Sequence, residues 1–268
     1  MTLGLGDLAF VGSLTGGAAY DADAQDFINR VIAADVAAGN TSGLEVGVQD
    51  AYNAFVVGCK ADGIWSAIKA SCILAGARTL NGCLVPLVGT APTNNNFVSG
   101  DYNRKTGLVG NGSTKYLDSN RNNNADPQNN NHNCLYISSA NNVTQVLMGT
   151  TGGVFTGANS ILNSGGNIFT RNRTSSARVL GTATPLGLLG TSRSSSSEYV
   201  SRYNKLNTTT GSSSQIPQNF NVCVFAGFGP DSPSNSRISF YSIGESLDLA
   251  LLDARVTTLI NAIAAAIP

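Results

Sequence analysis

The chain has 268 residues, of which only 12% are charged, about half of the usual ~25%. Its formal net charge is zero, which excludes nucleic acid and anionic membrane surfaces as expected partners, because both bind through many Lys and Arg side chains. No apolar run approaches the ~20 residues that span a bilayer, so we expect no membrane insertion.

Residues 1–20 are rich in glycine and apolar side chains but have no sustained helical or strand periodicity. They predict an N-terminal arm that serves as an attachment segment. Two interpretations stay open: a disordered leader, or a segment that becomes ordered only against a partner.

The segment 21–90 carries apolar side chains at helical spacing and predicts a small helical region. Asp21 or Asp23 caps a first helix, and a second helix follows at about 44–60. A third apolar stripe, at residues 64–73, is also expected to be helical. Its Trp65 is expected in the core rather than on a ligand platform.

Residues 91–268 have a different pattern, in which short β-branched and aromatic runs alternate with clusters of Asn, Gly and Ser. This pattern predicts a mainly β domain, an antiparallel β-sandwich. The Asn-rich run 121–133 and the Ser-rich run 192–197 are expected to be polar surface loops. The clearest strand runs are residues 116–117, 135–138, 144–148, 167–170, 178–180, 199–203, 222–226 and 237–243.

The chain ends in an amphipathic helix, predicted from apolar side chains at spacings of three and four. Its stripe packs either between the subunits of a trimer or on its own sandwich. The stripe consists of Leu249, Leu252, Val256, Leu259 and Ile263.

Five cysteines at wide spacings form no C-x-x-C pair, which argues against a zinc site or a redox motif. We predict free thiols buried in apolar surroundings. The N-terminus also lacks the basic region of a signal peptide, and both features indicate a protein made in a reducing cytoplasm. The cysteines are Cys59, Cys72, Cys83, Cys134 and Cys223.

Two stretches carry a resemblance to known folds. Residues 107–117 (GLVGNGSTKYL) resemble the early strand-turn-strand of concanavalin A-like and laminin-G-like jelly rolls. Residues 237–247 (RISFYSIGESL), followed by a helix, resemble the last strand and terminal helix of the same family. The resemblance implies a jelly roll.

A second resemblance brackets the chain after residue 20. The segment from YDADAQDFI at 20–28 to GIW at 63–65, and the ending FYSIGESL at 240–247, are similar to structural proteins of tailed phages, including marine and cyanobacterial ones. That family comprises fibre, spike, collar and capsid-decorating proteins. It implies a position on the virion without fixing which one.

Catalytic motifs are weak. A retaining glucanase of this architecture needs paired carboxylates with E-x-D-x-E spacing, whereas Glu45, Glu198 and Glu245 each lack an acidic neighbour two residues away. Ser246 lies in a Gly-Glu-Ser-Leu sequence similar to the nucleophile block of Gly-Asp-Ser-Leu esterases. The only histidine, His132, lies upstream of it, so we expect Ser246 to cap the last helix and His132 to be a loop residue.

Binding motifs are equally sparse. Asp101, Asp118 and Asp126 sit near loops where such folds hold calcium, but they follow no spacing rule and more often act in turns. Tyr199 and Tyr203 share one face of a strand and are core or sugar-binding surface, with core favoured, while Tyr102 and Tyr116 flank the Gly-rich loop. The sequence therefore assigns no catalytic, cofactor-binding or metal-ligating residue.

These features favour a non-enzymatic phage structural protein, made in the host cytoplasm and exposed on the virion as a tail or collar fibre or a capsid decoration. Its expected partners are other virion proteins, reached through the N-terminal region, and further copies of itself, most simply in a trimer. The alternative is a glycan-binding, receptor-recognising module of a tail fibre. A polysaccharide-degrading enzyme is the third and least favoured interpretation.

Overall fold

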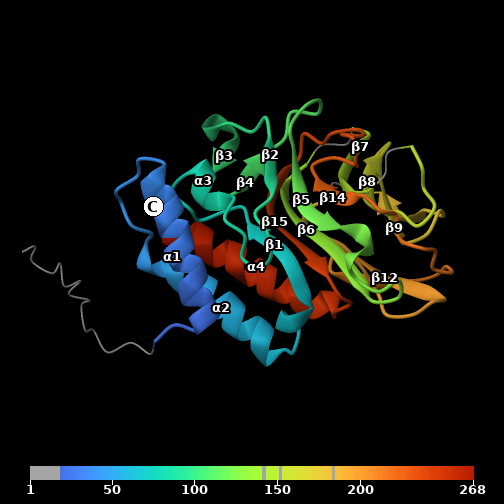
Figure 1. The fold of residues 1–268 in the computed structure, drawn as a ribbon, viewed down its shortest axis with the longest axis horizontal. Coiled ribbons are helices and arrows are strands. Elements are labelled where there is room, and N and C mark those ends of the chain that lie inside the picture. Colours follow the sequence, from blue (N-terminus) through green and yellow to red (C-terminus); the bar gives the residue numbers. More distant parts are fainter. Residues whose placement is uncertain (1–18, 141–142, 151–152, 183–184) are drawn as a thin grey trace, which may run out of the picture.

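The computed structural model describes residues 19–140, 143–150, 153–182 and 185–268. Three layers follow one another in it: a group of helices, a first β-sheet (sheet A) and a second β-sheet (sheet B). Figure 1 shows the helices α1, α2 and α4 on one side of the molecule and the strands β7, β8 and β9 on the other. The predicted arm lies outside the described residues, apart from its last two positions.

Sheet A has eight strands among the described residues, in the order β13-β12-β11-β6-β15-β4-β3, and β1 pairs with β15 beside β4. Its strands are β1 (Ile68–Ile73), β3 (Tyr102–Asn103), β4 (Gly107–Val109), β6 (Asn131–Ser139), β11 (Gly187–Arg193), β12 (Glu198–Tyr203), β13 (Leu206–Gly211) and β15 (Arg237–Gly244).

Sheet B has seven strands within the described ranges, in the order β10-β9-β8-β7-β14-β5-β2. These strands are β2 (Thr93–Asn95), β5 (Tyr116–Asn122), β7 (Gln145–Gly149), β8 (Asn159–Ser164), β9 (Asn167–Asn172), β10 (Arg178–Thr182) and β14 (Asn221–Val224). The strand pairings found in the described part of both sheets are antiparallel, so the predicted antiparallel sandwich is confirmed.

Part of the space between the two sheets is apolar, and part is filled by polar side chains that hydrogen-bond to one another. Asn131 on β6 donates to Asn172 on β9 at 3.1 Å, and Asn172 donates to Thr191 on β11 at 3.1 Å. Asn159 on β8 donates to Asn123 at 2.6 Å. A buried amide without a partner is destabilising, so these bonds are what make Asn tolerable inside the sandwich.

The helices lie on the outer side of sheet A, where α4 and α2 contact the strands and α1 packs on α2. They are α1 (Ala22–Ala37), α2 (Val46–Ala61) and α4 (Leu249–Ala266). Phe55 on α2 meets Phe240 on β15 edge to face, with ring centroids 5.6 Å apart. The five stripe residues of α4 are at most 2% exposed, and α4 lies against α2 and β11 of its own chain. The second of the two packing alternatives is therefore the one observed.

By length and composition alone, α4 could cross a membrane, and it is the one helix of the described part for which this holds. Its most apolar side chains are buried against α2 and sheet A, as in the core helix of a folded domain.

The predicted third helix is wrong. Residues 65–67 form a single 3₁₀ turn (Trp65–Ala67), and β1 follows directly as a strand paired with β15. Nearly all residues of β1 are buried, because one face of the strand packs on helices and the other on the sandwich core. A short apolar run of this kind cannot be distinguished from a helix by periodicity. The next helix, α3 (Leu80–Cys83), has one turn.

The two predicted polar loops are partly strand. The run 121–133 contributes its first residues to β5 and its last three to β6, and Ser192 belongs to β11. The cysteine prediction is confirmed, since all five thiols are free and buried. Burial raises the pKa of Cys59, Cys72 and Cys223 to about 12.

Candidate binding site

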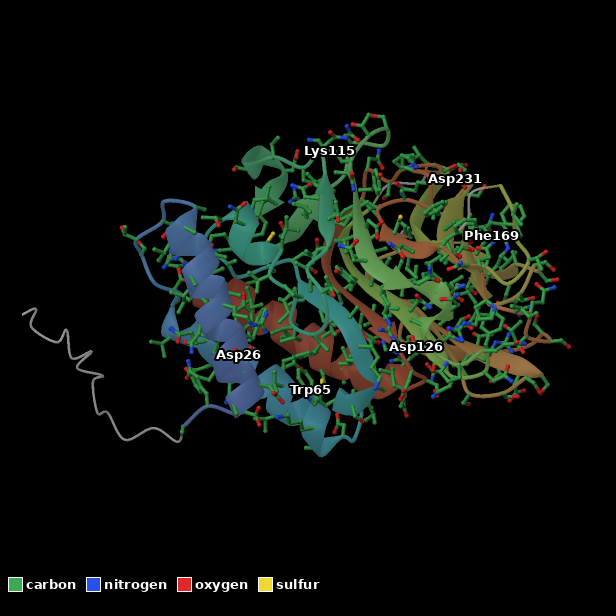
Figure 2. All side chains as sticks on the ribbon, in the orientation of Figure 1. Asp26, Trp65, Lys115, Asp126, Phe169 and Asp231 are labelled. Atoms are coloured by element: carbon green, nitrogen blue, oxygen red, sulfur yellow. The ribbon has the colours of Figure 1, made fainter. Side chains whose placement is uncertain are left out.

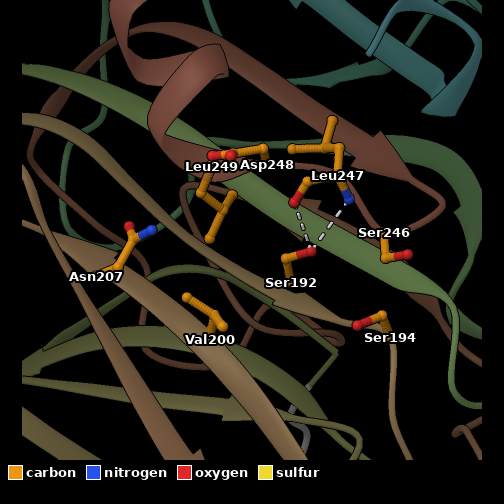
Figure 3. Close-up of a pocket in the computed structure, with 8 residues that line it drawn as sticks. All are labelled: Ser192, Ser194, Val200, Asn207, Ser246, Leu247, Asp248 and Leu249. Atoms are coloured by element: carbon orange, nitrogen blue, oxygen red, sulfur yellow. Dashed lines mark hydrogen bonds between the residues drawn. The ribbon is translucent and has the colours of Figure 1, made fainter. Parts of the chain in front are cut away.

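A shallow groove of about 290 Å³ opens on the outer face of sheet A, beside the N-terminal end of α4 (Figure 3). Two distant parts of the sequence form it, namely the strands β11 to β13 and the connection from β15 to α4. The lining side chains are mostly small and uncharged: Ser192, Ser194, Val200, Asn207, Ser246, Leu247, Asp248 and Leu249. We call this feature the Ser-lined groove.

A hydroxyl group joins the two walls of the groove. Ser192 Oγ donates to the carbonyl of Leu247 at 2.8 Å and accepts from the amide of Leu247 at 3.1 Å, as the dashed lines in Figure 3 mark. Ser246 is held in turn by Asn130, whose Oδ1 accepts from the Ser246 amide at 2.8 Å and from its hydroxyl at 2.6 Å. These bonds keep the connection in place before any ligand arrives.

The opposite rim is formed by β13. Asn207 Oδ1 accepts a hydrogen bond from Arg202 at 3.0 Å, and Arg202 also donates to Asp253 on α4 at 2.8 Å. The carbonyl side of the Asn207 amide therefore points at the sheet. Within the described part of the chain, its NH₂ group and the hydroxyl of Ser194 make no hydrogen bond, and both residues are exposed. Both groups are available to a ligand.

The N-cap of α4 differs from the predicted one. Asp248 caps the helix, since its Oδ1 accepts from the amides of Ala250 at 2.7 Å and Leu251 at 3.3 Å. Ser246, the predicted cap, lies two residues earlier and bonds to Asn130. Either residue type can cap a helix, and the sequence offers both within three positions.

His132 is not in a loop, which corrects the prediction. It lies on β6 with its side chain fully buried. Its Nε2 is 2.8 Å from Ser242 Oγ on β15, and its Nδ1 is 2.5 Å from the carbonyl oxygen of Glu245. Burial lowers the pKa of His132 to about 4. A serine and a histidine in contact suggest a nucleophile and its base, but no substrate reaches a pair whose side chains are both inaccessible.

The three glutamates lie on different elements and do not form a carboxylate pair. Glu45 precedes α2 and bonds to Arg104 and Arg78, and the Arg104 hydrogen bonds keep its pKa below the usual value. Glu245 follows β15 and pairs with Lys69 at 3.3 Å. Glu198 starts β12 and is exposed.

The three aspartates considered for calcium have separate partners. Asp101 pairs with Lys115 at 2.6 Å, and Asp126 pairs with Arg121. Asp118 accepts from the side chain of Asn221 at 3.2 Å. No group of three or more His, Cys, Asp or Glu side chains is close enough to hold a metal ion within the described residues.

The tyrosines give no sugar platform. Tyr199 is 1% exposed and donates to the carbonyl of Thr170 at 3.0 Å between the two sheets. Tyr102 donates to the carbonyl of Ala77 at 2.9 Å. Tyr203 and Tyr116 are only partly exposed and pack against the core. The preference for core is confirmed for Tyr199, which is fully enclosed.

Sequence reasoning missed the Ser-lined groove. Its residues 192–207 and 246–249 are separated by about forty positions and meet only because β11, β6 and β15 lie side by side. The Ser-rich run 192–197 is the one available signal, and by itself it predicts only a polar surface loop.

Comparisons with known proteins reveal similarity only in architecture, among solved structures. No protein-family profile matches the chain, and no curated protein matches it either. Among solved structures, the binding domain of botulinum neurotoxin serotype D superposes with a TM-score of 0.49 at 10% identity, over 72% of this chain and 50% of that one. This chain thus spans about half the length of that structure.

Two further structures are similar at lower scores. Domains LG4–5 of the mouse laminin α1 chain give a TM-score of 0.35 at 13% identity, over 62% of this chain and 47% of that one. Domain 4 of AbnA, an extracellular arabinanase from Geobacillus stearothermophilus, gives 0.39 at 13% identity, over 65% and 82%.

Proposed function

We propose that the chain is a non-enzymatic carbohydrate-recognition module, carried on the outside of a tailed-phage particle, and that the Ser-lined groove takes a neutral saccharide. The observation that carries this proposal is the chemistry of the groove. Apart from the carboxylate of Asp248, its open polar groups are neutral hydroxyl and amide groups, and its floor is apolar at Val200 and Leu249.

A saccharide presents hydroxyl groups at its edges and C–H groups on its faces, so it needs neutral donors and acceptors together with an apolar surface. The exposed groups of Ser194 and Asn207 supply the former, and Val200 supplies the latter. Asp248 is the one charged residue of the lining, and its carboxylate is already bonded to the helix amides. An acidic saccharide would meet this negative charge with no cation in the lining to offset it, so a neutral ligand is favoured.

The groove is pre-formed, which lowers the conformational entropy lost on binding. Ser192 and Asn130 hold the 246–249 connection by four hydrogen bonds. The only histidine, His132, is enclosed and does not line the groove, so the groove offers no imidazole base to a serine hydroxyl. The groove is therefore suited to holding a ligand rather than to cleaving one.

The location on a virion rests on the sequence. The two phage-like stretches, the weakly charged and amide-rich surface, and the buried free thiols support a protein made in a reducing cytoplasm and then assembled onto a particle. The N-terminal region is the proposed attachment segment, and a homo-oligomer, most simply a trimer, is the proposed assembly.

The binding proposal is tested on a glycan array that includes lipopolysaccharide fragments. We expect binding to at least one neutral glycan, and an affinity loss of at least about tenfold, roughly 1.4 kcal/mol, for Ser194→Tyr, whose ring would fill the groove. Ser196→Tyr is the matched control, since Ser196 is exposed in the same loop but does not line the groove. No binding to any neutral glycan, or equal losses in both variants, would contradict the proposal.

The virion proposal is tested separately, by antibody labelling of intact particles and by deletion of residues 1–18. The deletion leaves the hydrogen bond from Tyr20 to Asp50 at 2.6 Å, which anchors the start of α1 to α2. We expect a folded protein that no longer joins particles. Unlabelled particles, or normal incorporation of the truncated protein, would overturn the virion role and leave glycan binding untouched.

A further inference from the structure

A second pocket, of about 470 Å³, lies among the loops beside sheet B, near the Asp231 label in Figure 2. Its centre is a pair of stacked aromatic rings, Phe220 and Phe228, whose centroids are 4.4 Å apart with 21° between the ring planes. Val154 and Pro230 add apolar walls, and Asp231 adds a carboxylate. We call it the Phe pocket.

Apolar side chains of the Phe pocket are exposed to solvent, although contact with water does not stabilise apolar surface. Val154 is 58% exposed and Phe220 is 38% exposed. Single exposed apolar residues are common on protein surfaces, but an aromatic pair and an aliphatic side chain around one pocket are a feature of binding sites.

The loops that carry these side chains are firmly held. Gln218, two residues before Phe220, donates from its amide to the carbonyl of Gly157 at 3.2 Å and from its side chain to the carbonyl of Val154 at 2.8 Å. Thr150 donates to the other end of the Gln218 side chain at 2.7 Å. Gly157 has a φ of +67°, and a Cβ there would lie 1.8 Å from the carbonyl oxygen of Ile216, so only glycine permits this approach.

The opposite wall is a tight turn. The backbone groups of Gly227 and Asp231 bond to each other in both directions, at 2.8 Å and 3.2 Å, and this closes the turn that presents Phe228. The exposed Phe220 ring and the partly exposed Phe228 ring are therefore held on two rigid supports, as a pre-organised contact surface requires.

We propose that the Phe pocket binds one pyranose ring of a neutral saccharide, with a C–H face of the sugar against the stacked phenyl rings and its hydroxyl groups donating to Asp231. Aromatic rings beside a carboxylate can bind either a quaternary ammonium group or a sugar, and the ring geometry decides between these two ligand classes. A quaternary ammonium group is bound by rings that surround it at steep angles. Phe220 and Phe228 instead stack on each other, with centroids 4.4 Å apart and 21° between the planes, so the pair forms no cage and offers a ligand an outer ring face, which matches one face of a sugar.

The Phe pocket shares no lining residue with the Ser-lined groove. This inference therefore goes beyond the proposed function and is correct or wrong independently of the groove. If both sites bind, the protein can hold two sugar units at once, and multivalent contact would strengthen attachment to a densely glycosylated surface.

The test is saturation-transfer NMR on the full chain carrying Ser194→Tyr, which fills the Ser-lined groove, with methyl glycosides of glucose, galactose, mannose and N-acetylglucosamine, and with choline as the cationic probe. We expect transfer to the C–H protons of one face of at least one glycoside and none to choline. Phe220→Ala should reduce the transfer by about fivefold, since a stacking contact is worth about 1 kcal/mol.

The matched control is Phe155→Ala. Phe155 is 42% exposed, beside Val154, but its ring packs under Arg171 at 4.3 Å and does not line the pocket. Val154→Arg is a second blocking variant at an exposed position, in case the loss of Phe220 disturbs the loops. No transfer to any glycoside, transfer to choline alone, or a signal in the Ser194→Tyr parent that neither Phe220→Ala nor Val154→Arg reduces would overturn the proposal.

Discussion

His132 on β6 and Ser242 on β15 are joined by a hydrogen bond of 2.8 Å between Nε2 and Oγ, and both side chains are fully buried. The other ring nitrogen, Nδ1, lies 2.5 Å from the carbonyl oxygen of Glu245, which can only accept. Nδ1 therefore carries the proton, and Nε2 accepts from the serine hydroxyl. The pair connects two neighbouring strands to the start of the connection that lines the Ser-lined groove.

This pair predicts an acid-sensitive fold. The pKa of His132 is lowered from 6.5 to about 4 by burial, so the unfolded chain takes up a proton below pH 6.5 while the folded chain does not. Stability is complete above pH 6.5 and is lost as the pH falls towards 4. We expect the free energy of unfolding to drop by about 2 kcal/mol between pH 7 and pH 5, as measured by urea titration.

The control for the pH experiment is His132→Gln, which removes the only histidine. The variant is expected to be less stable at pH 7 but to lose little further stability down to pH 5. Carboxyl groups whose pKa is lowered in the folded state, such as Glu45 and Asp101, contribute only at lower pH. An unchanged slope in the variant would show that His132 is not the group responsible.

The ion pair between Arg202 on β12 and Asp253 on α4 predicts a strong coupling between helix and sheet. The side chains are 12% and 6% exposed, and Nε is 2.8 Å from Oδ2. Arg202→Met leaves a buried carboxylate and should destabilise the protein by about 3 kcal/mol. The double variant Arg202→Met/Asp253→Leu should be more stable than the sum of the single losses by about 2 kcal/mol in a denaturant double-mutant cycle. Additive losses would refute the coupling.

Replacing Arg193 is expected to lower the stability of the protein for a different reason, because its hydrogen-bond partners are carbonyl groups. It is fully buried and donates to the carbonyls of Asn172, Ser195, Glu198 and Ser212 at 2.9–3.1 Å. Arg193→Met leaves these acceptors without their donor, and we expect a destabilisation of at least about 3 kcal/mol in urea unfolding.

The control is Arg178→Met, at an exposed position on the edge strand β10, with an expected change within about 0.5 kcal/mol. A similar small change for Arg193→Met would mean that water replaces the guanidinium at no cost.

The proposed absence of enzymatic activity is also testable. The purified protein is expected to release no reducing sugar from host lipopolysaccharide or capsule over prolonged incubation, because Glu45, Glu198 and Glu245 lie apart and Ser242 is enclosed. Release above a heat-denatured control, abolished by one of the variants Glu198→Gln or Glu245→Gln, would refute this.

The sequence alone predicts those elements of the fold in which a pattern repeats over many residues. The stripe of α4 has five apolar positions at helical spacing, and helix and stripe are both observed. The alternation of short strands with polar clusters likewise predicted the sandwich. Strand β1 was missed because six residues with nearly continuous burial give neither a period of two nor a period of 3.6.

The polar interior could not be predicted, because it depends on contacts between distant segments. Asn131 is an ordinary loop residue by type, and it is buried on β6 only because Asn172, forty-one positions later, supplies an acceptor. His132 was misplaced for the same reason. The groove lining depends on the pairing of β6 with both β11 and β15, a register that no local motif specifies.

The central claim is that the Ser-lined groove holds a neutral saccharide. Its most direct test is amide chemical-shift mapping of isotope-labelled protein titrated with the best glycan from the array. The account predicts that the largest shifts fall on Ser194, Asn207 and Asp248, and that they disappear in Ser194→Tyr. Shifts confined to another surface, or no shifts at saturating glycan, would contradict it.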